Sequence, residues 1–185
     1  MLVLPLPQSA ALLEPGQVFF SLGEGYLSHN IAMETGQEPY QAGLLVPTHC
    51  GIVLEDGYVA EAWYPRFRVV ALHERLEKRE PLVWLKTPAG QTRESAEELC
   101  RRARELEGVE YDAWGVLGFT LSDKDDNGQS ANRLEDPAKH FCSEGVDLLL
   151  RATEHLRTVA LPKAWKLVHP SWRSPQGLNV SPIWG

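Results

Sequence analysis

The sequence has few cysteines: three in 185 residues, and they lie far apart. An odd number of scattered cysteines is typical neither of a disulfide framework nor of a zinc site, and a reducing compartment is the natural expectation. Long apolar runs are also missing, because Pro5 and Pro7 interrupt the apolar N-terminus. The N-terminus carries no early Lys or Arg, so it is a poor signal peptide. Its apolar run is also too short to span a bilayer. We expect a cytoplasmic protein without a membrane span, although export that leaves no N-terminal signal stays open.

The sequence also lacks a surplus of basic residues. The chain has 18 Lys and Arg residues against 25 Asp and Glu residues, a net charge of −7. Such a chain lacks the positive charge that neutralises phosphates, which argues against nucleic acid or an anionic membrane as a partner. The composition is that of a globular protein, with 43% hydrophobic residues. Residues 1–185 are expected to form a single domain with a sizeable core.

Short strand-like segments without long intervening helices predict an antiparallel sheet. We expect these strands at residues 17–21, 48–54, 58–63, 66–72 and 81–86. Together with the helices below, they predict an α+β fold.

Helical periodicity is clearest in residues 92–106, with Thr92 or Ser95 as the N-cap and Gly108 after the end. A second helix follows Cys142 and is apolar nearly all round, so we expect it to be buried. The tryptophans of the C-terminal tail predict that this tail docks on the domain. Shorter helical segments are expected at residues 9–14, 26–34 and 73–80, the last as a charged turn on the surface.

Residues 48–63 predict a β-hairpin. A two-residue turn would put His49 and Glu61 on opposite faces. A three-residue loop at residues 55–57, with a left-handed Gly57, makes His49 and Glu61 diagonal neighbours about 7–8 Å apart, with open space beside the glycine between them. We favour the second register because it gathers one apolar face: Cys50, Ile52, Leu54, Tyr58, Ala60 and Ala62.

Cys142 is the cysteine best placed for reactivity. It begins the buried helix, where backbone N–H groups and the helix dipole favour the thiolate and can stabilise an oxyanion. His49 oriented by Glu61 supplies the base half of a catalytic triad. His140 is the alternative base, but a separation of two residues is poor geometry for contact with Cys142. Spacing alone leaves open a half-exposed strand histidine beside an ordinary surface glutamate.

The other two cysteines receive no chemical role. Cys50 alternates onto the strand face opposite His49, and Cys100 lies in an apolar helix stripe.

The sequence resembles the circularly permuted branch of the NlpC-type papain-like cysteine hydrolases, the YiiX-like proteins. The resemblance covers about residues 15–155 and rests on short motifs in this order: PGQVFF at 15–20, THCGIV at 48–53, VAEA at 59–62, YD at 111–112 and FCSE at 141–144. It implies a papain-like fold in which the antiparallel sheet packs on helices and the nucleophile begins a helix. The usual papain-like order, Cys before His, is reversed.

Residue by residue, the resemblance implies that Cys142 is the nucleophile, His49 the base and Glu61 the residue that orients the imidazole. Tyr111 and Ser143 are implied at the oxyanion or substrate site. Two departures stand outside this triad: Gln17 replaces the usual Asp, and Cys50 replaces the usual apolar residue.

The implied activity is hydrolysis of an amide in a peptide or small acyl-amide, through a thioester and without a required cofactor. The wider superfamily resembles lecithin retinol acyltransferase, so an acyltransferase or thioesterase with a lipid or acyl substrate is an alternative. A non-catalytic binding protein on the same fold, with calcium-dependent binding as one form of it, is another.

The acidic loop of residues 123–135 fits the first half of a calcium-binding loop. The matching residues are Asp123, Asp125, Asn127 and Gly128. The bidentate acid belongs at the position of Leu134, whereas Glu135 comes one residue late, and clear flanking helices are missing. Ca²⁺ binding is therefore one interpretation of this loop, and a solvated acidic turn is the favoured one.

Overall fold

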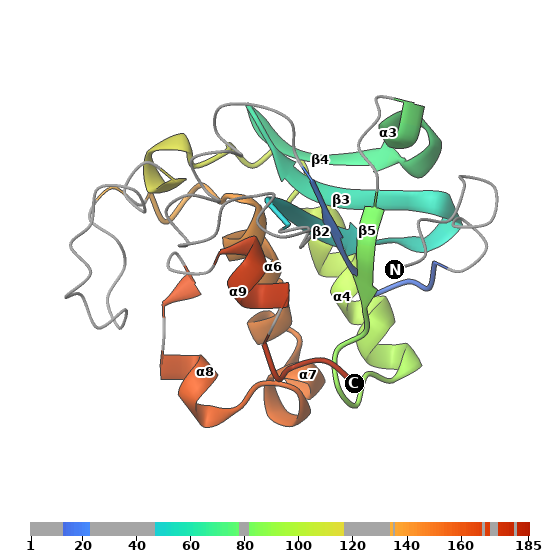
Figure 1. The fold of residues 1–185 in the computed structure, drawn as a ribbon, viewed down its shortest axis with the longest axis vertical. Helices are drawn as coiled ribbons and strands as arrows, with labels where there is room; N and C mark the ends of the chain where they lie inside the picture. Colours follow the sequence, from blue (N-terminus) through green and yellow to red (C-terminus); the bar gives the residue numbers. More distant parts are fainter. Residues whose placement is uncertain are drawn as a thin grey trace, which may run out of the picture.

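The computed structural model describes residues 13–22, 47–77, 82–116, 134, 136–167, 169–170, 174–179 and 181–185. These residues form an α+β fold around a five-stranded sheet with the order β4-β3-β2-β1-β5 (Figure 1). All neighbouring strands run antiparallel, which confirms the predicted class and sheet type. Among the helices described, none has the length and apolar character needed to cross a membrane.

The predicted strands are confirmed to within a few residues at each end. The strands are β1 (Val18–Ser21), β2 (His49–Val53), β3 (Tyr58–Trp63), β4 (Arg66–Ala71) and β5 (Leu82–Lys86). The helices are α3 (Leu72–Glu77), α4 (Arg93–Glu105), α6 (Cys142–Ala152), α7 (Glu154–Val159), α8 (Lys163–Leu167) and α9 (Pro175–Asn179). The predicted helix at 26–34 and most of the turn at 9–14 lie outside the described residues.

The hairpin of β2 and β3 has the register that a three-residue loop predicts. Ile52 pairs with Ala60, and the backbone N–H of Leu54 donates to the carbonyl oxygen of Tyr58 at 2.9 Å. Gly57 ends the loop with a φ of 76°, a left-handed conformation that a residue without a β-carbon adopts at little cost. The register therefore brings the expected side chains onto each face of the sheet.

The two faces of the hairpin belong to two apolar clusters. The main core contains five members of the predicted apolar face: Cys50, Ile52, Leu54, Ala60 and Ala62. The sixth, Tyr58, is 41% exposed at the strand end. The other face contributes Val53 and Val59 to a smaller cluster with Phe19. Helix α6 packs against β2 and β3, so the main core lies between this helix and the sheet.

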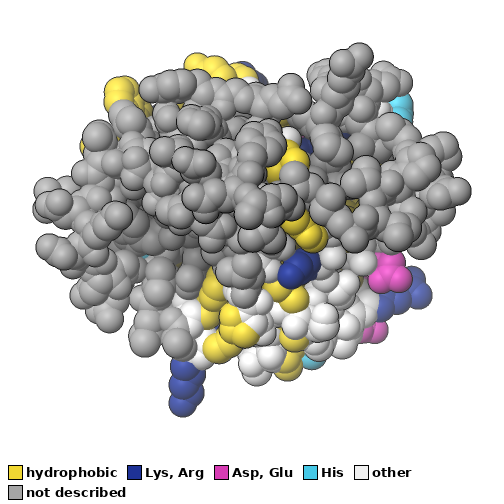
Figure 2. All heavy atoms as spheres, viewed as in Figure 1, with side chains coloured by type: hydrophobic (Ala, Val, Ile, Leu, Met, Phe, Trp, Pro, Cys, Tyr) yellow, Lys and Arg dark blue, Asp and Glu magenta, His cyan; other side chains and the backbone are white. Residues whose placement is uncertain are grey.

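Helices α6, α7 and α9 lie together on one side of the sheet, whereas α3 lies away from them beyond β4 (Figure 1). Thr92 caps α4, because its side chain accepts a hydrogen bond from the backbone N–H of Ser95 at 3.2 Å. The end of the chain docks as predicted at Trp184, whereas Trp172 lies outside the described residues. Ile183 is buried, and the ring of Trp184 packs edge-on against Phe20 at 5.9 Å. In the described part of the face in Figure 2, Lys and Arg side chains stand apart from one another.

Gly51 is required by close packing on the second face of the sheet. A β-carbon at this position would lie 2.5 Å from the carbonyl oxygen of Ala60 and 2.6 Å from the ring of Phe19. The sequence predicts open space here between His49 and Glu61. That prediction is wrong, because the Phe19 ring occupies the space and packs against the His49 ring at 6.2 Å.

We predict that Gly51→Ala destabilises the fold. The added methyl group has to displace strand backbone or the Phe19 ring, and overpacking of this kind costs about 1–3 kcal/mol in the free energy of unfolding. Urea denaturation measures the loss. Gly145→Ala is the control, because the nearest atom beyond its own helix lies 3.5 Å away on Phe67, and this change should not reduce stability. An unchanged urea midpoint for Gly51→Ala would contradict the prediction.

Candidate active site

A fully buried carboxylate, that of Glu61 in β3, anchors the site. Its Oε1 accepts a hydrogen bond from Nε of Arg68 at 2.9 Å. Its Oε2 accepts one from Nε of Arg75 at 2.9 Å and lies 2.8 Å from Nε2 of His49. Both carboxylate oxygens are thus in contact with nitrogen atoms, and the side chains of Arg68, Arg75 and His49 surround the buried charge.

The two arginines reach Glu61 from different elements. Arg68 lies directly opposite Glu61 in the β3–β4 pair. Arg75 comes from α3, and its Nη2 also donates to Oγ of Ser21 at 2.8 Å. The Arg75 guanidinium lies 4.7 Å from the centre of the Phe19 ring, a cation–π arrangement. The expected surface helix is therefore only partly a surface element, because its arginine is buried.

These contacts keep Glu61 ionised. Burial alone would raise the pKa of this carboxyl group, since it disfavours the charged form. The hydrogen bond and charge of His49, with the charges of Arg75 and Arg68, outweigh burial and hold the pKa well below its usual range. Glu61 is consequently a hydrogen-bond acceptor throughout the neutral pH range.

His49 takes its orientation from Glu61. Because the Glu61 carboxylate carries no proton, Nε2 of His49 must donate, which leaves Nδ1 for the hydrogen bond that links His49 to Cys142. The ring of Trp63 packs edge-on against the imidazole at 5.3 Å, with Phe19 on another side. Burial lowers the pKa of His49, but hydrogen bonds and charge from Cys142 and Glu61 raise it to about 9.

Cys142 is the first residue of α6, after the N-cap residue Phe141. Its side chain is nearly buried, with 3% exposed. A hydrogen bond from the Cys50 thiol lowers the pKa of Cys142, burial opposes this, and the hydrogen bond and charge of His49 lower it further. The net pKa lies well below that of an ordinary thiol, so Cys142 and His49 form a thiolate–imidazolium pair.

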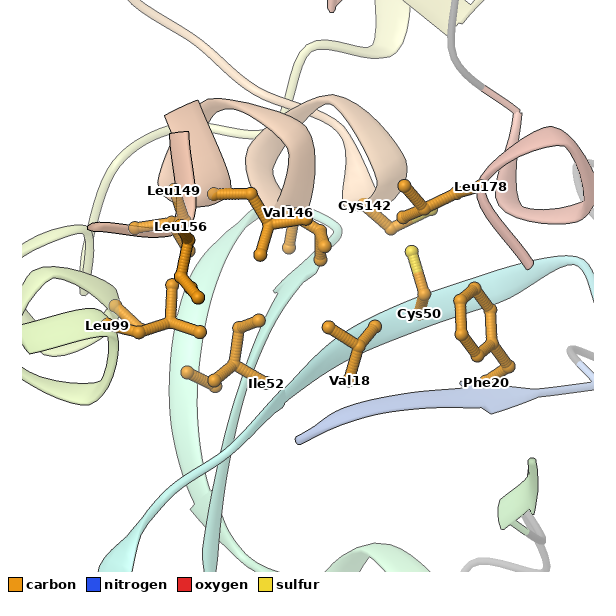
Figure 3. Packing of buried hydrophobic residues seen from close by; sticks show 14 of the residues in the cluster. Val18, Phe20, Cys50, Ile52, Leu99, Cys142, Val146, Leu149, Leu156 and Leu178 are labelled. Carbon is orange, nitrogen blue, oxygen red and sulfur yellow. The ribbon is translucent and has the colours of Figure 1, made fainter. Parts of the chain in front are cut away.

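Cys50 is one contributor that the sequence analysis missed, besides Arg68 and Arg75. Its predicted side of the strand is confirmed, but α6 covers that side, and the Cys50 sulfur points toward Cys142 (Figure 3). Strand alternation was the only available signal, and it could not show which helix lies above the strand. Cys100 is placed as predicted, buried in the core with its thiol 3.5 Å from the carbonyl oxygen of Val53.

The alternative base, His140, lies beside Glu144, and its buried Nδ1 makes no hydrogen bond among the described residues. Its Nδ1 lies 3.9 Å from Oε2 of Glu144, whereas His49 is the histidine hydrogen-bonded to Cys142. The structure therefore pairs Cys142 with His49.

Tyr111 and Ser143 both lie beside Cys142. Ser143 is the second residue of α6 and is buried. Burial raises the pKa of Tyr111 well above its usual value, and the negative charge of Cys142 adds to this effect. The Tyr111 hydroxyl consequently keeps its proton and can donate it in a hydrogen bond.

The buried carboxylate of Asp112 ties the Tyr111 segment to the residues before α6. It accepts hydrogen bonds from the backbone N–H of Gly115 at 2.7 Å and of Asp136 at 3.1 Å. In addition, the backbone N–H of His140 donates to the carbonyl oxygen of Glu110 at 3.2 Å. These bonds fix the approach of the chain to the N-terminus of α6.

A cavity of about 360 Å³ has Tyr111 among its lining residues. Two exposed aromatic side chains border it, Tyr64 and Trp114, with 69% and 65% of their surfaces exposed. The remaining lining residues are Pro65, Arg66, Glu110, Ala113 and Lys139. Tyr111 thus lines this cavity and is also close enough to Cys142 to sense its charge.

The candidate calcium ligands Asp123, Asp125 and Asn127 lie outside the described residues, and the calcium interpretation stays a prediction. Within the described part of the chain, no group of three or more His, Cys, Asp or Glu side chains is arranged to hold a metal ion. Comparison with models of protein families and with curated proteins finds no match for this chain.

We predict that Glu61→Gln strongly destabilises the protein. The amide keeps the shape of the side chain but leaves the Arg68 and Arg75 charges without their counter-ion. Breaking a buried ion pair in this way costs about 3–5 kcal/mol, which urea denaturation at neutral pH can measure. Glu97→Gln is the matched control, because its ion pair with Arg93 is exposed, and its urea midpoint should equal that of the wild type.

The difference between wild type and Glu61→Gln should also depend on pH. The folded-state pKa of Glu61 is depressed, so its contribution is complete above the ordinary value of 4.5 and is lost as the pH falls through the folded pKa. A difference in unfolding free energy that stays constant well below pH 4 would contradict this assignment.

Proposed function

We propose that the protein is a cysteine hydrolase of the circularly permuted papain-like type, which cleaves an amide bond through a thioester on Cys142. The observation that carries this proposal is one continuous chain of hydrogen bonds from Arg68 and Arg75 through Glu61 and His49 to Cys142. An activated thiol, a base and a group that orients the base are the parts that nucleophilic catalysis requires. The substrate we propose is a peptide or small acyl-amide.

In the first step, the Cys142 thiolate attacks the carbonyl carbon of the amide, and the carbonyl oxygen becomes an oxyanion. This negative charge develops beside the N-terminus of α6, where the helix dipole and the backbone N–H groups of the first turn stabilise it. The Tyr111 hydroxyl, whose proton is retained, is the second donor that we assign to the oxyanion.

In the second step, the His49 imidazolium gives its Nδ1 proton to the leaving nitrogen, and the C–N bond breaks. An amine departs and a thioester on Cys142 remains. His49, now neutral, then accepts a proton from a water molecule that attacks the thioester. Breakdown of this second tetrahedral intermediate releases the carboxylic acid and restores the thiolate–imidazolium pair.

Glu61 is a positioning residue in this scheme. Because both of its oxygens are bound, the imidazole keeps one tautomer and one orientation while Nδ1 gains and loses its proton. The order of the parts along the chain, with His49 before Cys142, supports the permuted variant of the fold.

We predict that Cys142 reacts with iodoacetamide as a thiolate at neutral and mildly acidic pH. An ordinary thiol is only a few per cent ionised at pH 7, so His49→Ala, which removes a hydrogen bond and a positive charge, should slow labelling of Cys142 about tenfold or more at this pH. Peptide mapping by mass spectrometry reads each cysteine separately. The control is Cys100→Ala, in which iodoacetamide should label Cys142 as fast as in the wild type.

The rate of amide hydrolysis should fall on the alkaline side as the pH rises through about 9, the pKa of His49, because the leaving nitrogen then loses its proton donor.

The labelling experiment also tests the proposal as a whole. If wild-type Cys142 reacts with iodoacetamide no faster than a free thiol at pH 7, the proposed hydrolase is wrong.

We propose that the cavity beside Tyr111 receives part of the substrate. Stacking on Trp114 and Tyr64 favours a planar or apolar group there. Trp114→Ala should therefore slow labelling of Cys142 by an aryl-substituted vinyl sulfone about three- to tenfold, since an aromatic contact contributes about 0.5–1.5 kcal/mol. Labelling by the small reagent iodoacetamide should not change. Equal slowing of both reagents would show that Trp114 acts on the thiol and not on the substrate.

A further inference from the structure

Cys50 is a second thiol inside the candidate site, and the hydrolytic scheme gives it no covalent role. It lies on β2, wholly buried, and its sulfur points toward Cys142 at the start of α6 (Figure 3). The two side chains are joined by a hydrogen bond. A thiol donor and a thiolate acceptor in hydrogen-bond contact are close enough for one sulfur to attack the other after a small shift of the side chains.

We propose that Cys50 and Cys142 form a reversible disulfide when a hydroperoxide oxidises the protein, so that the pair is a site of oxidative modification. The inference rests on the reactive Cys142 of the proposed function, and the experiment below separates the two. The observation behind the inference is a pair of buried, neighbouring thiols on two different elements. A disulfide between β2 and α6 requires both of these thiols.

The chemistry starts at Cys142. Its thiolate attacks one oxygen of the hydroperoxide, the O–O bond breaks, and the leaving oxygen takes the Nδ1 proton of the His49 imidazolium to give water or an alcohol, which leaves His49 neutral. Cys142 is then a sulfenic acid. The Cys50 thiol gives up its proton, with His49 beside the pair as the acceptor, and its sulfur attacks the Cys142 sulfur. The S–O bond breaks and the hydroxide leaves as water with that proton. Each sulfur has lost one electron and the peroxide has gained two.

The electrostatics of the pair fit this order of events. Burial and the Cys142 thiolate raise the pKa of Cys50, so Cys50 stays a thiol while Cys142 is the nucleophile. Oxidation of Cys142 to the sulfenic acid removes the neighbouring negative charge, which makes Cys50 easier to ionise. Cys100 lies elsewhere, with its thiol toward the carbonyl oxygen of Val53 and its pKa raised to about 12, and takes no part.

The test exposes the reduced full-length protein to a few equivalents of hydrogen peroxide at neutral pH. Free thiols are then alkylated, and peptides are mapped without reduction. We expect a cross-linked peptide that joins Cys50 to Cys142, a protein lighter by two hydrogen atoms, and recovery of both thiols with dithiothreitol. In Cys50→Val, Cys142 should pass to the sulfinic acid, which dithiothreitol does not reverse. Cys100→Ala is the matched control and should form the same cross-link as the wild type.

Two results would overturn the inference. Dimedone trapping of a sulfenic acid on wild-type Cys142 without any cross-link would show that Cys50 does not resolve it, while the reactive nucleophile of the proposed function stands. A Cys142 that peroxide leaves unmodified would remove the disulfide and the activated thiol together. The wild-type peptide map decides between these results even if Cys50→Val fails to fold.

Discussion

The ionised carboxylate of Glu61 is the interaction on which the rest of the site depends. A buried charge of this kind is tolerated only when it is paired and hydrogen-bonded, because desolvation of an isolated carboxylate costs far more than one contact returns. Two arginines and His49 fulfil that condition. They also join four elements, since β3 supplies the acid, β4 and α3 the arginines, and β2 the histidine. The same pairing that stabilises the sheet therefore fixes the direction of the imidazole.

The balance of charge explains why the site carries two arginines. Glu61 alone would stabilise the His49 imidazolium but would also repel the Cys142 thiolate. Arg68 and Arg75 keep Glu61 ionised and, with it, carry a net charge of +1, so the three side chains together add no negative charge beside the thiolate while Glu61 still holds Nε2 of His49. Burial strengthens each of these interactions, because the effective dielectric constant is lower than that of water. The arginines thus reconcile an oriented base with an ionised nucleophile.

Local pattern predicted much of this arrangement. The three-residue loop of the hairpin fixed the diagonal relation of His49 and Glu61, because strand register follows from turn length. The start of an apolar helix identified Cys142. The Glu61–Arg68 pair was within reach of the same reasoning, since the short turn at Tyr64 and Pro65 sets the β3–β4 register. Arg75 was not, because a charged helical turn looks exposed until the tertiary structure shows a carboxylate beneath it.

Cys50 shows a different limit of sequence reasoning and also a compromise in the chemistry. Strand alternation correctly predicted on which face of the sheet the Cys50 side chain lies, but its contact with Cys142 depends on how α6 crosses the sheet. A thiol donor to the thiolate raises the ionised fraction of Cys142, yet a thiolate becomes a weaker nucleophile as its pKa falls. At neutral pH the pKa of Cys142 already lies well below that of an ordinary thiol, so further lowering by a donor adds little to the reactive fraction and reduces the intrinsic reactivity. An apolar residue at this position would serve hydrolysis alone at least as well, and the extra sulfur becomes useful where the nucleophile has to survive oxidation.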